Sequence, residues 1–319
     1  MGNMDSLQVK HGQLCSIEEF STAVAPAGWG IDFCQLDRGR GGVVMDLVGT
    51  SESLLLRTDL HNRVHQQAVP PPGSVTWAFL CADQAPFKIG KRSVEPDALV
   101  CVHPELGLDG VNESGFSAYT ASFSAERISE IAERIGVACP SLARESRGIP
   151  QCVDSGVITR VRHIIGMIYE QARLCDTSDN VNFNHLIDSE LPLELLTIMA
   201  SGTSVPDHRP SNRSRALQRA LEYIQDNPRA LFSLEQLCRY SACSLSTLER
   251  AFRDHFGVSP KQYLIAIRLN GVRKHLLSPE ESRGVGDVAT EWGFWHLSKF
   301  ASDYKRMFGE LPSATRMAA

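Results

Sequence analysis

The chain has 319 residues, 43% of them hydrophobic and 22% charged, and a net charge of −5, which is ordinary for a soluble globular protein of about two domains. No uninterrupted apolar stretch approaches the ~20 residues that cross a bilayer, and the start of the sequence lacks a secretory signal, so we expect neither a membrane protein nor a secreted one. The nine cysteines are odd in number and include no C-x-x-C pair, which predicts reduced thiols in a cytoplasmic protein and argues against disulfides or a zinc site.

The two halves of the chain differ in charge. Residues 213–319 hold 16 Lys and Arg against 11 Asp and Glu, whereas residues 1–212 hold 16 against 26, so the net charges are +5 and −10. An acidic half joined to a basic half is expected when only one domain meets a polyanion. Random partition of the charges is the alternative.

Short apolar runs separated by turn signals fill residues 30–123. Residues 43–45 and 54–56 are two such runs, and the Pro-Pro-Pro-Gly of residues 70–73 is one of the turns. Many short strands at close spacing favour an antiparallel β-barrel or sandwich. From residue 124 to about 200 the apolar spacing becomes helical. The sequence therefore predicts an α+β N-terminal domain over residues 1–200, a barrel with a helical tail. That tail either forms a homodimer or packs on its own barrel.

A linker is predicted over residues 201–212. This segment has two prolines, a glycine and small polar residues, and it lacks apolar periodicity. The following residues, 213–319, have helical patterns throughout, which predicts an all-α C-terminal domain.

The C-terminal domain contains a repeat. Five positions recur at a constant offset of 52: Leu248, Phe252, Phe256, Gly257 and Pro260 return as Phe300, Tyr304, Phe308, Gly309 and Pro312. In both copies, three large apolar residues at i, i+4 and i+8 mark one helix face, and a Gly ends the helix. A shorter apolar segment precedes each copy. Short helix, turn and second helix outline a helix-turn-helix, predicted here at about 233–257 and 285–309.

Capping residues mark where the predicted helices begin. Ser233 with Gln236 forms a capping box, and Ser244 caps the second helix of the first pair. Ser259 precedes Pro260 at the first helical position, with Gln262 three residues after the cap. The helix from there to about residue 277 would connect the two pairs.

Residues 213–316 resemble the DNA-binding domain of the AraC/XylS family of bacterial transcription regulators. The first part of the signature is Ser-Leu-Ser-Thr-Leu-Glu-Arg-Ala-Phe at 244–252, followed by Phe-Gly-Val-Ser-Pro at 256–260, Tyr263 and Arg268-Leu269. The second part includes Val288-Ala289, Gly293-Phe294, Phe300, and residues 304–306 and 308–313. The N-terminal half resembles the cupin-type sensor halves of such regulators only in general terms.

The resemblance implies that the second helix of each pair, the recognition helix, enters the major groove of double-stranded promoter DNA. On the first recognition helix, the positions matching the family's contacts are Ser246, Thr247, Glu249, Arg250 and Arg253. Arg250 is the strongest candidate, because its planar guanidinium can bind guanine O6 and N7 together. Glu249 would accept from a cytosine amine or hold Arg250 in place. The alternative is that both are solvated polar residues.

The second recognition helix offers Leu297, Ser298, Lys299, Ala301, Ser302, Lys305 and Arg306. The family often has Arg where this chain has Ser302, and it usually has Asp or Ser at the capping position that His296 occupies. We therefore expect this helix to contribute phosphate contacts through Lys299, Lys305 and Arg306, and apolar contacts with thymine methyl groups.

Other chemistry has little support in the sequence. His61, His65 and His103 are the only candidate metal ligands, but a strand spacing of four puts His61 and His65 some 13 Å apart, too far for one ion. We therefore expect no metal and no cofactor.

A ligand cavity in the barrel is a separate hypothesis, because small barrels can enclose one small molecule. Its candidate lining residues are Trp77, Phe79, His65 and Tyr119. Trp77 and Phe79 are two apart and share a face, so both alternatively fill the core.

The sequence thus predicts a bacterial DNA-binding transcription regulator, an activator if it follows the family, that responds to a small-molecule effector and acts with RNA polymerase. It predicts no enzyme. Two alternatives stay open: a metal-dependent cupin enzyme with an appended DNA-binding domain, and an effector-independent DNA-binding protein whose barrel is an interaction module.

Overall fold

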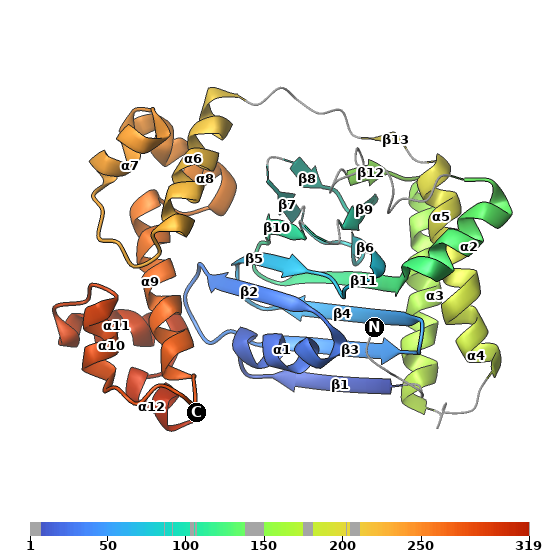
Figure 1. Ribbon diagram of the computed structural model, residues 1–319, viewed down its shortest axis with the longest axis horizontal. Coiled ribbons are helices and arrows are strands. Elements are labelled where there is room, and N and C mark those ends of the chain that lie inside the picture. The colour runs from blue at the N-terminus through green and yellow to red at the C-terminus, as the bar shows by residue number, and fades with distance from the viewer. Residues whose placement is uncertain are drawn as a thin grey trace. The chain divides into compact units, whose positions relative to one another are not determined.

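The computed structural model describes residues 8–85, 87–90, 92–102, 105, 107–137, 150–174, 181–201, 203–204 and 211–318. The chain divides into two compact units (Figure 1). Unit 1 comprises Met1–Phe33, Gly42–His61 and Gln66–Pro206, and unit 2 comprises Cys34–Gly41, Asn62–His65 and Asp207–Ala319. The N-terminal part is rich in strands and the C-terminal part is helical, which confirms the predicted two-domain fold class.

Two antiparallel sheets form the N-terminal part. The strands are β1 (Gln8–Leu14), β2 (Gly30–Gln35), β3 (Val43–Gly49), β4 (Ser53–Leu60), β5 (Val64–Val69), β6 (Ser74–Leu80), β7 (Phe87–Ile89), β8 (Arg92–Val94), β9 (Ala98–Val102), β10 (Leu108–Val111), β11 (Phe116–Ser124), β12 (Pro150–Cys152) and β13 (Thr203–Ser204). The first sheet has the order β1-β3-β4-β11-β6-β9-β12-β13, and the second has the order β2-β5-β10-β7-β8.

Two elements precede the point near residue 30 where the sequence predicts the barrel to begin. Among the described strands, β1 pairs only with β3 and forms the edge of the first sheet, so its residues are solvent-exposed or half-buried and show no apolar alternation. Helix α1 (Ile17–Val24) has a single short apolar face, and Ser16 caps it by accepting a hydrogen bond from the Glu19 amide at 3.2 Å.

Side chains of the first sheet alternate between two environments. On the central strands, even-numbered residues such as Leu56 and Ala118 border a pocket that residues of the second sheet also line. Odd-numbered residues such as Leu55, Trp77 and Phe123 belong to a core shared with helices. This period of two is what a strand imposes on its side chains.

A helical layer covers the odd-numbered face of the first sheet. Its helices are α2 (Ala125–Ile135), α3 (Ser155–Leu174), α4 (Val181–His185) and α5 (Leu191–Ser201), with a π-helical turn at Leu186–Glu190, and Figure 1 shows them gathered beside the sheet. The buried side chains include Ile131 of α2, Ile165 of α3 and Leu195 of α5. Arg173, in the last turn of α3, donates a hydrogen bond to Asp46 of β3.

Unit 2 contains seven helices among its described residues: α6 (Asn212–Asp226), α7 (Leu234–Ser241), α8 (Leu245–Phe256), α9 (Pro260–Leu276), α10 (Val285–Glu291), α11 (Leu297–Phe308) and α12 (Pro312–Met317). Helix α6 packs on α7 and α8. Helix α9 packs on α8 and also on α10, α11 and α12, so it joins the two helix pairs α7–α8 and α10–α11.

The predicted caps are present. The Ser233 side chain accepts from the Gln236 amide at 3.2 Å, and the Gln236 side chain accepts from the Ser233 amide at 2.7 Å. The same reciprocal pair forms between Ser259 and Gln262. Ser244 accepts from the amide of Thr247 at 3.3 Å. These bonds satisfy amides that the first helical turn leaves without partners.

The segment predicted as a linker, 201–212, lies largely outside the described residues. Ser201 ends α5, Thr203–Ser204 form β13, and Asn212 begins α6. The division into residues 1–200, 201–212 and 213–319 stays a prediction.

Candidate nucleic-acid interface and ligand pocket

The two helix pairs of unit 2 have the same internal packing. In the first pair, Leu248, Phe252 and Phe256 of α8 are buried, and the rings of Phe252 and Phe256 lie 5.5 Å apart. In the second pair, the equivalent residues Phe300, Tyr304 and Phe308 of α11 are buried. The predicted i, i+4, i+8 faces therefore point into the unit, and the opposite faces of α8 and α11 point out.

Each pair contains a tight turn. Ala242 ends α7 in a left-handed conformation with φ of 50°, a position that costs a non-glycine residue about 1–2 kcal/mol. In the second pair, Gly293 has φ of 82° and takes the positive angle without that cost. The second turn is closely packed, because Trp292 lies against Gly271 of α9, where a Cβ atom would come within 2.3 Å of the indole.

The residues predicted to contact DNA lie on the outward faces. On α8, Ser246, Arg250 and Arg253 are exposed, and Thr247 and Glu249 are half-buried. The Thr247 hydroxyl lies 2.9 Å from that of Ser244, so it belongs partly to the helix cap. On α11, the side chains of Ala301 and Asp303 are half-buried, and the predicted contacts left exposed are Leu297, Ser298, Lys299, Ser302, Lys305 and Arg306.

Four of the basic side chains on these faces have no ion pair within the described part of the chain: Arg250, Arg253, Lys299 and Lys305. Elsewhere in unit 2, basic residues do pair, as Arg229 does with Glu291 at 2.5 Å. Arg306 hydrogen-bonds Asp303 one turn earlier. The outward faces therefore offer uncompensated positive charge, which suits an anionic partner.

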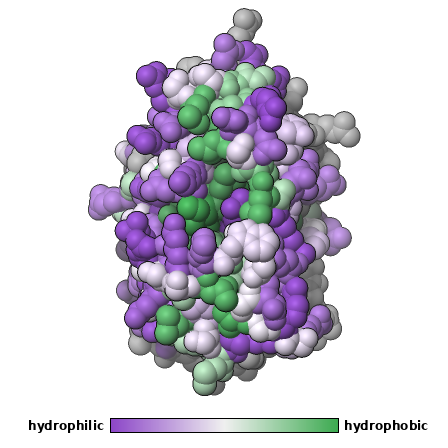
Figure 2. All heavy atoms as spheres, turned by 90° about the vertical axis from the view of Figure 1, so that its left-hand side faces the viewer, coloured by the Kyte–Doolittle hydropathy of each residue, from purple (hydrophilic) through white to green (hydrophobic). Residues whose placement is uncertain are grey.

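Two exposed apolar residues in this region are missing from the sequence-based candidates. Trp295, in the turn before α11, is 68% exposed, and Leu245, the first residue of α8, is 47% exposed. Leu245 lies 52 positions before Leu297, so the repeat offset could have identified it. Figure 2 shows a band of apolar side chains flanked by hydrophilic ones on this side of the molecule.

His296 does not cap α11. The structure gives its side chain no capping hydrogen bond, whereas Ser244 caps the equivalent helix α8. The difference follows from the sequence, because imidazole replaces the short hydroxyl that the cap position favours.

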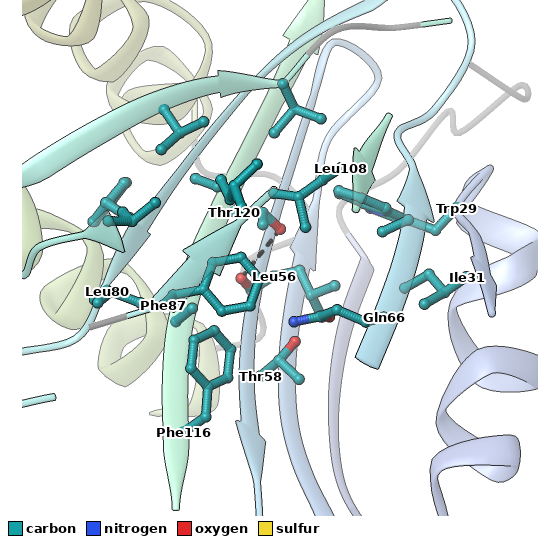
Figure 3. Close-up of a pocket in the computed structure, with 18 of the residues that line it drawn as sticks. Trp29, Ile31, Leu56, Thr58, Gln66, Leu80, Phe87, Leu108, Phe116 and Thr120 are labelled. Atoms are coloured by element: carbon teal, nitrogen blue, oxygen red, sulfur yellow. Dashed lines mark hydrogen bonds between the residues drawn. The ribbon is translucent and has the colours of Figure 1, made fainter. Parts of the chain in front are cut away.

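A pocket lies within unit 1, between the two sheets (Figure 3). It holds about 710 Å³ of space, including its open mouth. The first sheet contributes Leu56, Thr58, Ala78, Phe79, Leu80, Val100, Val102, Phe116, Ala118 and Thr120, and the rest of the lining is Phe20, Trp29, Ile31, Gln66, Ala68, Phe87, Ile89, Val94 and Leu108.

Of the four predicted effector-binding residues, only Phe79 borders this pocket. Its ring packs on that of Tyr119, at 5.6 Å, on the helical side of the sheet. Trp77 lies in the core on that side, and the Tyr119 ring stacks on Tyr169 of α3 at 6.2 Å. His65 belongs to unit 2 and is not in the lining.

The tyrosines between sheet and helices have altered acidity. Burial raises the pKa of Tyr119 to about 12, and it raises the pKa of Tyr169 well above its ordinary value. Both phenols therefore stay protonated to a higher pH than a solvent-exposed tyrosine does.

In the described part of the chain, no three His, Cys, Asp or Glu side chains are grouped so that they could hold a metal ion. His103, the third predicted candidate, lies outside the described residues. Within the same residues, every helix is too short or too polar to cross a membrane.

A family model described as a helix-turn-helix domain matches residues 237–318. An activator of the XylDLEGF operon from Pseudomonas putida, numbered 3, is 30% identical over 156 residues, which are 48% of this chain and 45% of that protein. The activator numbered 2 is 37% identical over 99 residues, 31% of this chain and 63% of that protein. The transcriptional activator RhaS of Enterobacter sp. (strain 638) is 27% identical over 164 residues, 51% of this chain and 56% of that protein. The chain thus spans about half the length of most of these curated relatives.

Solved structures are similar to about a third of the chain. A probable AraC family transcriptional regulator from Rhodopseudomonas palustris CGA009 is 32% identical, covers 33% of this chain and 96% of its own, and has a TM-score of 0.31. The DNA-binding domain of AdpA, solved in complex with a target DNA, is 26% identical over 32% of this chain and 91% of its own, with a TM-score of 0.30.

Proposed function

We propose that this chain, whose C-terminal region belongs to the AraC/XylS family of helix-turn-helix domains, is a sequence-specific DNA-binding transcription regulator. The observation that carries the proposal is the pair of outward helix faces on α8 and α11, whose basic side chains lack ion pairs in the described part of the chain. Promoter DNA lies in the cytoplasm of a bacterium, so the protein would act there. Activation is the proposed sense of the regulation, because the curated relatives above are activators.

The two recognition helices would have different tasks. In the first pair, the exposed guanidinium of Arg250 would bind a guanine through two hydrogen bonds, which is worth about 1–3 kcal/mol of discrimination against another base. Ser246, Thr247, Glu249 and Arg253 would supply the remaining contacts of α8. Phosphate contacts fix the register but do not distinguish sequences.

The second recognition helix would bind mainly the DNA backbone. Lys299 and Lys305 are exposed and unpaired among the described residues, and Arg306 would join them by exchanging Asp303 for a phosphate. Close packing against the DNA would be the contribution of Ser298, Ala301 and Ser302. Their side chains are too short to reach a base edge as an arginine does. Leu297 would contact thymine methyl groups.

The pocket of unit 1 would be the effector site. A mostly apolar pocket with a few polar groups is the usual form of a small-molecule site. Effector binding would shift the population of protein arrangements toward one that binds DNA or RNA polymerase differently. The coupling is reciprocal, so DNA would tighten effector binding by the same factor. The helical layer of α2–α5 would be the dimerisation element if the protein forms a homodimer.

The proposal is tested by selection from random 40-base-pair duplexes with the purified full chain, followed by titration of the selected duplex and a scrambled one. We expect the selected duplex to bind about 10³-fold more tightly at moderate salt, the lower range for specific binding. Arg134→Ala, which removes an exposed charge from unit 1, should bind both duplexes as the parent chain does. Enrichment of no sequence, with equal binding of both duplexes, would reject the proposal.

A further inference from the structure

The lining of the unit 1 pocket contains no charged side chain among the described residues. Its walls are aliphatic and aromatic, with Leu56, Phe87 and Phe116 close to the centre of Figure 3. An ionised ligand group would lose its hydration there and gain no opposite charge. The cost of moving an unpaired ion into such surroundings exceeds that of any single polar contact.

Trp29, one of the residues that line the pocket, carries a hydrogen-bond donor without a partner in the described part of the chain. Trp29 is 5% exposed, and its indole Nε1 is buried with no hydrogen-bond partner within the described residues. An unsatisfied buried donor costs about 1–3 kcal/mol, so a ligand atom that accepts from it recovers that energy. An indole N–H donates only, which fixes the matching ligand group as an acceptor.

Two further polar side chains line the same pocket. Figure 3 shows Gln66 and Thr58 among the side chains that point into it, and neither has a hydrogen bond within the described residues. Thr120 is different, because its hydroxyl already donates to the backbone oxygen of Leu56 at 3.5 Å. Three polar side chains of the lining, those of Trp29, Gln66 and Thr58, thus have no hydrogen-bond partner within the described residues.

We propose that the pocket binds an uncharged, mainly apolar small molecule with one or two acceptor oxygens, such as an aryl ketone, amide or ether. The oxygen would accept from Trp29 Nε1, and the Gln66 amide or the Thr58 hydroxyl would satisfy a second polar group. Carboxylates and amines are excluded by the uncharged wall. Sugars are excluded because most of their hydroxyls would lose water without a partner. The assignment of this ligand as the effector rests on the proposed function, whereas the ligand class does not.

The test uses three compounds of similar shape: acetophenone, benzoate and ethylbenzene. Acetophenone is neutral and has an acceptor, benzoate has a charge, and ethylbenzene has neither. A naphthalene series with the same three substituents extends the comparison to a larger ring. Binding is measured by calorimetry and by the melting temperature of the full chain, since a ligand of the folded state raises it.

We expect the ketones to bind about tenfold more tightly than the ethyl compounds, the value of one hydrogen bond of ~1.4 kcal/mol, and the carboxylates to bind most weakly. Equal or tighter binding of the carboxylates overturns the proposal, as does the failure of both ketones to bind.

Two tryptophan variants locate the donor. Trp29→Phe keeps an aromatic ring but removes the N–H, so it should abolish the preference for ketone over ethyl compound. Trp77→Phe is the matched control, because Trp77 also has a buried Nε1 without a described partner but lies in the core on the other side of the sheet. Equal effects of the two variants would show a structural cause and reject the role of Trp29.

The same samples separate this inference from the proposed function. If the ketones bind but the affinity for selected DNA does not change, the ligand class stands and the effector role fails. If the carboxylates bind and shift the DNA affinity, regulation by a ligand stands and the uncharged class fails.

Discussion

Leu245 and Leu297 occupy equivalent positions in the two helix pairs, each as the first residue of its recognition helix. These residues are 47% and 49% exposed, although leucine is most often buried. Contact with thymine methyl groups in two successive major grooves would account for both.

Replacing thymine by uracil in the selected duplex removes only these methyl groups. At the thymines that face Leu245 or Leu297, we expect a loss of about fourfold in affinity, the value of one buried methyl group of ~0.8 kcal/mol. Leu245→Ala should abolish the loss at its own thymine and leave the loss at the other. Leu311→Ala is the control, because Leu311 is similarly exposed but lies outside both helix pairs. If uracil lowered the affinity at none of the thymine positions, the contact with thymine methyl groups would be refuted.

Arg250→Ala should lower sequence discrimination. We expect the affinity for the selected duplex to fall by about 1–3 kcal/mol, with a much smaller loss on a scrambled duplex, because base contacts carry the discrimination. Arg250→Lys should restore only part of the loss, since an ammonium group lacks the rigid planar fork that preorganises the two hydrogen bonds. Equal losses on both duplexes for Arg250→Ala would assign this residue to the DNA backbone instead.

Lys305→Ala should weaken binding to all sequences alike. A lost phosphate contact reduces the slope of log affinity against log salt by about 1. Titrations at four salt concentrations on both duplexes measure this slope. A loss confined to the selected duplex, with an unchanged slope, would contradict the phosphate role.

Gly271→Ala should destabilise unit 2, although alanine is the better helix former. Its Cβ atom would lie 2.3 Å from the Trp292 ring, so α9 or the indole must move, at a cost of about 1–3 kcal/mol. Gly166→Ala in α3 is the matched case, because no atom lies within 4 Å of the added Cβ. That variant should stabilise unit 1 by about 0.5–1 kcal/mol. Urea denaturation followed by circular dichroism checks both, and two changes of the same sign would disprove the packing argument.

Asp46→Asn should remove part of the acid sensitivity of unit 1. Burial alone would raise the pKa of Asp46, but hydrogen bonds from Arg173 and His11 outweigh it and hold the pKa below its ordinary value. A lowered folded pKa gives stability that is present above the unfolded pKa of about 3.9 and is lost as the pH falls through the folded value.

We therefore expect Asp46→Asn to cost about 1–2 kcal/mol at pH 7, with a gap to the parent protein that narrows below about pH 4. The expected loss of stability is modest because Arg173 and His11, the partners of Asp46, are about half exposed. Denaturation midpoints between pH 7 and pH 3 give the gap. A constant gap across this range would show that the charge of Asp46 has no part in it.

The helical part of the fold could be predicted closely because its signals are local. Capping pairs such as Ser233–Gln236 fix where helices begin, and the 52-residue offset places the buried faces of α8 and α11. The same reasoning did not identify Leu245, because this exposed leucine is not part of the apolar spacing that marks the buried helix face. Only its position in the repeat distinguishes it.

The pocket could be predicted only in kind. The spacing correctly puts Trp77 and Phe79 on one face of β6, but which face meets the helical layer depends on how β6 pairs with β9 and β11. If the pairing register of β6 shifted by one residue, the side chains now in the core would face the pocket, and those now in the pocket would face the core. Trp29 is the residue before β2, and Gln66 lies on β5 of the second sheet, so no local pattern connects them with each other or with β6.

Along β6 and β11, side chains that face the pocket alternate with side chains that face the helical layer, so substitutions on the two faces have different effects. Substitutions at Ala78 or Ala118 reshape the space open to a small molecule, whereas those at Trp77 or Ala121 alter the seating of the helices. Apart from Phe79, which belongs to both sets, the residues that line the pocket and those that hold the helices are thus different residues of the same strands. A library restricted to the even-numbered positions would sample new specificities while the scaffold remains intact.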